Sequence, residues 1–167
     1  MTNPAIIEII KSKDAKKRYD FLLEGKVIAF LDFPNRWAKA AIAQAGDLQW
    51  KITRKGWWKH TIEISAEQSP YSKWNAAMGW RGTISIRTED NKQFHLKRKG
   101  FWNTSWVWMN EQNETVVELQ FNVWLSRKRG LITLNNTANS SLIWLSLVGW
   151  FIAICAREDA RAAAAAS

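Results

Sequence analysis

Residues 142–156, LIWLSLVGWFIAICA, constrain the fold of this chain more than any other segment. Ser146 is their single hydrophilic residue, so a helix formed there has no solvent-facing side and must be buried on every face. Spanning a membrane takes about 20 apolar residues. Polar residues at 139–141 and 157–159 bound the segment and limit its apolar length to about 22 Å. The sequence therefore predicts a helix enclosed by the rest of the chain.

The residues before this helix show the pattern of short strands separated by turns. Hydrophobic and polar residues alternate, most clearly where Val117, Leu119 and Phe121 share one face while Glu118 and Gln120 share the other. Turn-forming Gly, Pro, Asn and Asp residues divide the pattern into about twelve strands.

A chain of 167 residues is long enough for one domain with a substantial core. A barrel of about twelve strands is too wide to be filled by its own side chains, but one apolar helix can fill it. We therefore predict a mainly β domain over residues 1–167, a closed antiparallel barrel of about twelve strands enclosing one hydrophobic C-terminal α-helix. The strands are expected at about 5–135 and the helix at about 141–158, and the Ala-rich tail at 160–167 either continues the helix or frays.

One hairpin pattern occurs twice. Residues 49–58, QWKITRKGWW, align without a gap with residues 93–102, QFHLKRKGFW. Each copy predicts a strand, an Arg-Lys-Gly turn and a second strand that begins with aromatic residues. Two copies are too few for a stacked solenoid, so the repeat favours a barrel or meander built from hairpins.

These two hairpins, the segment GWRGT at 79–83 and the closing LIWLSLVGWFIAICARED resemble the tubby C-terminal-like superfamily, in particular its LURP-one-related and phospholipid-scramblase branch. The resemblance covers about residues 19–159 and implies a twelve-stranded barrel around a C-terminal helix. It also implies contact with lipid, because tubby domains bind phosphoinositide headgroups and scramblases act on phospholipid. The calcium-binding acidic segment expected of scramblases is not visible, so scramblase activity is not implied.

The formal net charge of +9 favours an anionic partner such as anionic lipid, nucleic acid or an acidic protein. In an up-and-down meander, successive turns alternate between the two ends of the barrel. One end is then basic and the other acidic. The helix would enter at the acidic end with its partly positive N-terminus and finish at the basic end, which is a favourable arrangement of its dipole.

The candidate binding residues are the basic residues of three turns at the basic end, with the aromatic residue that leads each of two following strands. Aromatic residues beside lysine and arginine are typical of a membrane interface. The alternative is that basic residues only keep strand edges soluble. The candidates for binding lipid or another anion are Arg54, Lys55, Trp57, Arg98, Lys99, Phe101, Arg127, Lys128 and Arg129.

No catalytic residue, metal site or cofactor is expected. The chain lacks G-x-S-x-G, a phosphate-binding glycine loop and H-E-x-x-H. His60 and His95 are isolated residues of predicted strands. Cys155 is the single cysteine, which excludes an internal disulfide, and its place on the apolar helix makes it a small buried hydrophobe.

The leading hypothesis is a non-enzymatic tubby-like barrel that docks on anionic membrane lipid headgroups or another polyanion through the basic end. The alternatives are a nucleic-acid-binding barrel and a membrane protein anchored by the helix at 142–156. The single cysteine fits a reducing compartment. A signal peptide has a charged segment before its apolar run, and the short apolar run at the N-terminus of this chain has none. The expected location is the cytoplasm, with or without peripheral attachment to a membrane.

Overall fold

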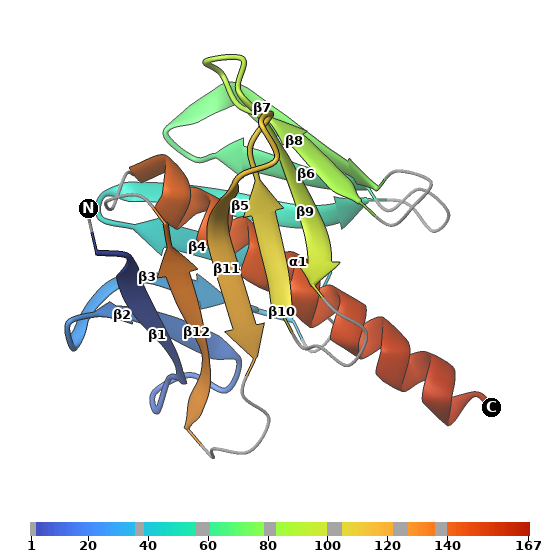
Figure 1. Ribbon diagram of the computed structural model, residues 1–167. Coiled ribbons are helices and arrows are strands. Elements are labelled where there is room, and N and C mark those ends of the chain that lie inside the picture. The colour runs from blue at the N-terminus through green and yellow to red at the C-terminus, as the bar shows by residue number, and fades with distance from the viewer. Residues whose placement is uncertain are drawn as a thin grey trace.

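The computed structural model describes residues 3–35, 39–55, 61–78, 83–99, 105–121, 127–135 and 140–167. Over these residues, twelve antiparallel strands form a closed barrel with a single C-terminal helix, α1 (Ser140–Ala165), running through it (Figure 1). The predicted fold class is confirmed. The strands are β1 (Ala5–Lys11), β2 (Arg18–Leu23), β3 (Lys26–Asp32), β4 (Ala40–Ala45), β5 (Leu48–Lys55), β6 (Thr61–Ala66), β7 (Ser69–Met78), β8 (Ile84–Arg87), β9 (Gln93–Lys99), β10 (Ser105–Met109), β11 (Thr115–Phe121) and β12 (Lys128–Leu134).

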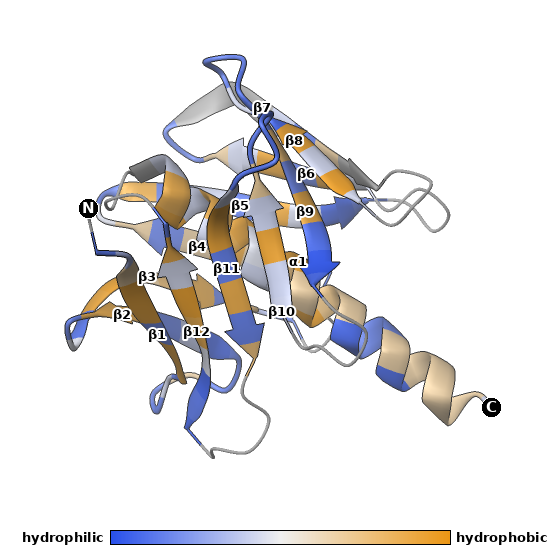
Figure 2. Ribbon diagram, viewed as in Figure 1, coloured by the Kyte–Doolittle hydropathy of each residue, from blue (hydrophilic) through white to orange (hydrophobic). Residues whose placement is uncertain are grey.

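The barrel is an up-and-down meander. Each strand pairs with its neighbours in sequence, and β1 pairs with β12 to close the ring. The connections that follow odd-numbered strands therefore share one end, which we call the basic end, and those that follow even-numbered strands share the opposite, acidic end. Described acidic residues in the connections of the acidic end are Glu24, Asp47, Glu67, Glu89, Asp90, Glu111 and Glu114. Figure 2 shows hydrophilic residues at the ends of β9 and β12 that lie at the basic end of the barrel.

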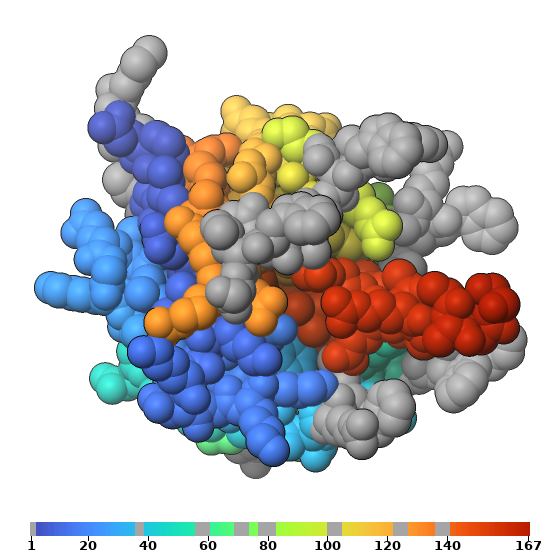
Figure 3. Space-filling model, turned by 90° about the horizontal axis from the view of Figure 1, so that it is seen from below, coloured from blue at the N-terminus to red at the C-terminus, as the bar shows by residue number. Residues whose placement is uncertain are grey.

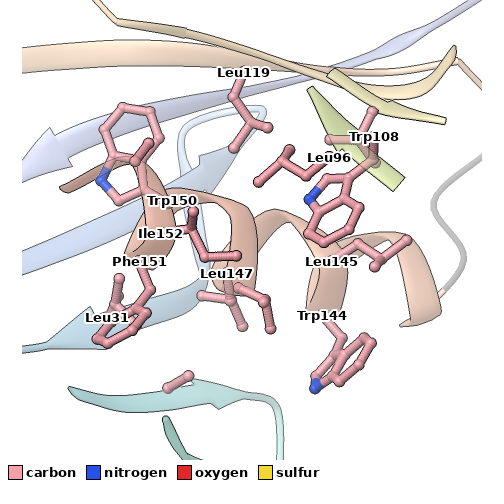
Figure 4. Packing of buried hydrophobic residues seen from close by; sticks show 14 of the residues in the cluster. Leu31, Leu96, Trp108, Leu119, Trp144, Leu145, Leu147, Trp150, Phe151 and Ile152 are labelled. Atoms are coloured by element: carbon pink, nitrogen blue, oxygen red, sulfur yellow. The ribbon is translucent and has the colours of Figure 1, made fainter. Parts of the chain in front are cut away.

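The core is formed by α1 and the inward-facing residues of the strands. Trp150 is fully buried, and its ring centroid lies 4.0 Å from that of Phe121, 6.1 Å from that of Tyr19 and 6.3 Å from that of Phe21. Figure 4 shows side chains leaving α1 in different directions to meet the surrounding strands. The hydroxyl of buried Ser146 donates a 2.7 Å hydrogen bond to the backbone carbonyl of Leu142, so this polar group is satisfied within the helix.

The helix extends into the Ala-rich tail. It continues to Ala165, so the tail follows the first of its two predicted alternatives, because alanine favours helix. Residues 159–167 are exposed, so the last turns project beyond the barrel (Figure 1). The N-terminus of α1 lies at the acidic end as predicted, and its C-terminus lies past the basic end, where Lys17 and Arg54 pair with acidic side chains of the helix.

The length argument against a membrane span does not apply to the complete helix. Over about 39 Å, α1 is the one helix in the described part of the chain that is long and apolar enough to cross a membrane. However, 67% of its apolar window is buried inside the barrel. Its apolar surface is therefore used in the core.

Three predicted turns are wrong at their edges. Lys55, Lys99 and the residues 128–130 belong to strands, because ladder pairing continues to the basic end. Lys55 pairs with Thr61, and Lys99 pairs with Ser105. Lys55, Lys99, Lys128 and Arg129 thus lie at strand ends instead of in turns.

Candidate functional site

The helix leaves the barrel at the basic end. Figure 3, seen from below, shows α1 in red beside β12 in orange and the segment around β1 and β2 in blue. There Asp159 accepts two hydrogen bonds from the guanidinium of Arg54, at 2.9 and 2.8 Å. The Nζ of Lys17 lies 3.6 Å from a carboxylate oxygen of Glu158. These two ion pairs attach the side of the helix to the barrel, and they use a predicted binding residue, Arg54, for a structural purpose.

Three further candidates also form ion pairs within the protein. Each of them lies on a strand and pairs with an acidic residue of another strand, which is the adjacent strand for Lys55 and Lys128 and the next strand but one for Lys99. Such exposed pairs contribute about 0–1 kcal/mol each, and they match the alternative that these lysines keep the strand edges soluble. The pairs are Lys55–Glu63 (3.7 Å), Lys99–Glu118 (3.2 Å) and Lys128–Glu8 (3.2 Å).

The other predicted residues differ in their surroundings. The guanidinium carbon of Arg98 lies 4.9 Å from the centroid of the Trp106 ring, in a cation–π contact. Arg127 is exposed just before β12. The predictions for Trp57 and Phe101 lie outside the described residues, as does that for His60.

Arg129 occupies a β-bulge. Ile9 of β1 pairs with Gly130 and Ile10 pairs with Lys128, so Arg129 is the extra residue on β12. A bulge changes the direction of a side chain relative to strict alternation. The Nε of Arg129 is buried and has no hydrogen-bond partner in the described part of the chain.

Arg129 lies near two arginines of α1 and a tyrosine of β2. Burial raises the pKa of Tyr19 and the negative charge of Glu158 adds to this increase, whereas the positive charges of Arg129, Arg157 and Arg161 act against it. Burial also lowers the pKa of Arg157, and repulsion from Arg161 and Arg129 lowers it further. We call Tyr19, Arg129, Arg157 and Arg161 the helix-exit cluster.

The arginines of the helix-exit cluster have no carboxylate partner among the described residues. The adjacent acids of α1, Glu158 and Asp159, pair with Lys17 and Arg54. Arg157 instead lies over the ring of Phe121, with its guanidinium carbon 5.6 Å from the ring centroid. Three like charges, two of them partly buried, repel one another, and an anion bound from outside would relieve this repulsion.

Sequence reasoning found Arg129 but missed the other members of the cluster. Arg157 and Arg161 are four residues apart and so lie on one face of the helix, a spacing that is visible in the sequence. Their proximity to Arg129 and Tyr19 depends on where the helix crosses the barrel wall, which no local pattern shows.

His95 and the residues that could bind a metal were also predicted to have no functional role. The Oγ of Ser85 and the Nδ1 of His95 lie 2.8 Å apart on neighbouring strands, so this histidine has a hydrogen-bond partner. No cluster of three or more His, Cys, Asp or Glu residues that could hold a metal occurs in the described ranges.

Cys155 is expected to react with thiol reagents only after the protein unfolds. It is 6% exposed, and burial raises the pKa of its thiol to about 12. The unfolded chain, with a thiol pKa near 9.0, loses its proton first, so this residue lowers stability as the pH rises from about 9 to about 12. Urea titrations across this range should show a weaker alkaline loss of stability in Cys155→Ala than in the wild type. An equal loss in both proteins, or rapid labelling of the folded protein at neutral pH, would contradict the prediction.

Comparisons of the chain with family models, curated proteins and solved structures found no match. The resemblance to the tubby-like superfamily therefore remains a prediction from the sequence.

Proposed function

We propose that this protein is a non-enzymatic, tubby-like barrel that docks on the anionic phospholipid headgroups of a membrane surface through its basic end. The observation that carries the proposal is the helix-exit cluster. Its arginines are held near one another by a bulge in β12 and by α1, and none of them forms an ion pair with a carboxylate among the described residues. Guanidinium groups bind phosphate oxygens through strong, charge-assisted hydrogen bonds.

The surroundings of the cluster support a membrane surface as the partner. Lys11, Lys13, Lys16 and Arg127 are exposed around the same end of the barrel. Each basic residue near an anionic membrane contributes about 1 kcal/mol of attraction. The sequence also has aromatic pairs directly after β5, at 57–58, and in the segment that follows β9, at 101–102, and aromatic residues favour membrane interfaces. A cytoplasmic protein with peripheral membrane attachment is consistent with this arrangement.

The proposal is tested with Arg129→Gln/Arg157→Gln in flotation assays with phosphatidylcholine vesicles, with and without phosphatidylserine. We expect the wild type to float only with anionic vesicles and only at low salt. The double variant should bind these vesicles with an affinity that is at least about tenfold lower. The matched control is Lys26→Gln/Lys51→Gln, which removes the same charge from exposed positions on β3 and β5. Its affinity should stay within about threefold of the wild type.

A second measurement separates lost binding from lost folding. Because the variant relieves repulsion within the cluster, its urea midpoint should equal or exceed that of the wild type. If the two double variants lose binding equally, binding depends on the net charge of the protein and not on the helix-exit cluster. Salt-resistant binding to neutral vesicles would favour anchoring by α1, and preferential displacement of vesicles by single-stranded nucleic acid would favour the nucleic-acid alternative.

A further inference from the structure

The opposite, acidic end of the barrel contains a cavity of about 630 Å³. Its floor includes the first turns of α1, and its walls come from the strands and turns between β3 and β9. Pockets for small molecules typically enclose about 300–1,000 Å³, with mostly apolar walls and a few polar groups. The cavity has this size and character, and the docking function proposed for the basic end does not use it.

Three indole rings line the cavity. Trp74 and Trp144 pack edge to face with ring centroids 5.6 Å apart, and Trp50 also contributes to the wall. The Nε1 of Trp144 is buried and has no hydrogen-bond partner among the described residues. In Figure 4, Trp144 leaves the helix on the side away from Trp108 and Leu119. Indole rings attract cations through their faces.

The charged groups that line the cavity are negative. Glu89 and Asp90 line it, and no lysine or arginine does so among the described residues. Asp90 is bound by Lys92 (2.8 Å), whereas Glu89 has no salt-bridge partner in the described part of the chain. Lys92 thus neutralises Asp90, and the N-terminus of α1, which contributes about half a positive charge at Ser140 and Ser141, offsets the charge of Glu89 only in part. An anionic ligand is therefore disfavoured.

We infer that this cavity is a binding site for a small amphiphilic cation, an apolar molecule that carries an amine or quaternary ammonium group. The apolar body packs between Trp50, Trp74 and Trp144, and the cationic group lies toward Glu89 at the turn between β8 and β9. Aromatic walls and a carboxylate together favour a cation over neutral and anionic molecules of the same shape.

The inference is tested with three probes that share one phenylpropyl body, namely phenylpropyl trimethylammonium, phenylpropanol and phenylbutyrate. Their binding is followed through the indole N–H signals of the full-length protein in nitrogen–proton correlation spectra, assigned with single Trp→Phe variants. The cation should shift the signals of Trp50, Trp74 and Trp144 and bind about fivefold or more tightly than the alcohol. The carboxylate should bind most weakly.

Glu89→Gln should weaken binding of the cation about threefold or more, because it removes the nearest unpaired carboxylate. The control Glu111→Gln removes a negative charge from the same end outside the cavity lining, and should leave the affinity unchanged. The inference is overturned if no probe shifts these three signals, if the alcohol or the carboxylate binds as tightly as the cation, or if both variants weaken binding equally.

Discussion

A chain that ends after Asn135 is expected to have no cooperative unfolding transition. Without α1, inward-facing residues such as Trp108, Leu119 and Phe121 lose the side chains that cover them. A barrel of twelve strands cannot fill its own interior, so the shortened chain would expose a large apolar surface to water. Urea titration followed by tryptophan fluorescence and near-ultraviolet circular dichroism measures the result, and binding of a hydrophobic dye should increase.

The matched control for this truncation is a chain that ends after Arg161. It keeps the buried part of α1, the Arg54–Asp159 pair and the helix-exit cluster, and it loses only exposed residues at 162–167. Its free energy of unfolding should stay within about 0.5 kcal/mol of that of the full chain. A sharp, cooperative transition in the chain that lacks α1 would show that the barrel has a core of its own and would refute the central role of the helix.

Gly130→Ala is expected to lower the free energy of unfolding by about 3 kcal/mol. A Cβ at this position would lie 2.1 Å from the backbone carbonyl oxygen of Gln120 and 2.7 Å from the Cη2 of Trp150. Replacing glycine with alanine usually favours the folded state by restricting the unfolded chain. At Gly130 the clash dominates, because the nearest obstacle is backbone of the adjacent strand, and relief of the clash must separate β11 from β12.

Gly25→Asn provides the contrast. Gly25 has a positive φ of 78° and no atom within 4 Å of an added Cβ, and it follows Glu24, also at positive φ. Asparagine tolerates this conformation in a two-residue hairpin, so the loss should be about 1 kcal/mol or less. A Gly130→Ala protein that unfolds at the same urea concentration as the wild type would show that the contact between β11, β12 and α1 is not tight.

The fold was predictable because each of its parts has a strong local pattern. Alternation along β11 gives the strand one buried face, and an apolar surface on every side of residues 142–156 requires enclosure. The boundaries at Lys55, Lys99 and Lys128 were less predictable, because ladder hydrogen bonds hold basic residues in strands that their composition assigns to turns.

The candidate site was predictable only as a set of charges at one end. Successive turns of a meander alternate between the two ends of the barrel. Strand order alone therefore shows which turns lie at the basic end and which lie at the acidic end. Which charges are neutralised does not follow. Arg54 and Asp159 are 105 positions apart in the chain, and their contact exists only because the helix crosses the barrel beside β5.

By itself, the sequence determined that an apolar helix lies within a meander of strands, and that opposite charges gather at its two ends, because periodicity and turn order are local properties. Only the tertiary structure decided which residues meet. The bulge at Arg129, the passage of α1 beyond the barrel and the cavity above Trp144 arise from barrel closure around the helix. Closure sets contacts between segments far apart in the chain, and these contacts separate the arginines that are paired from those of the helix-exit cluster.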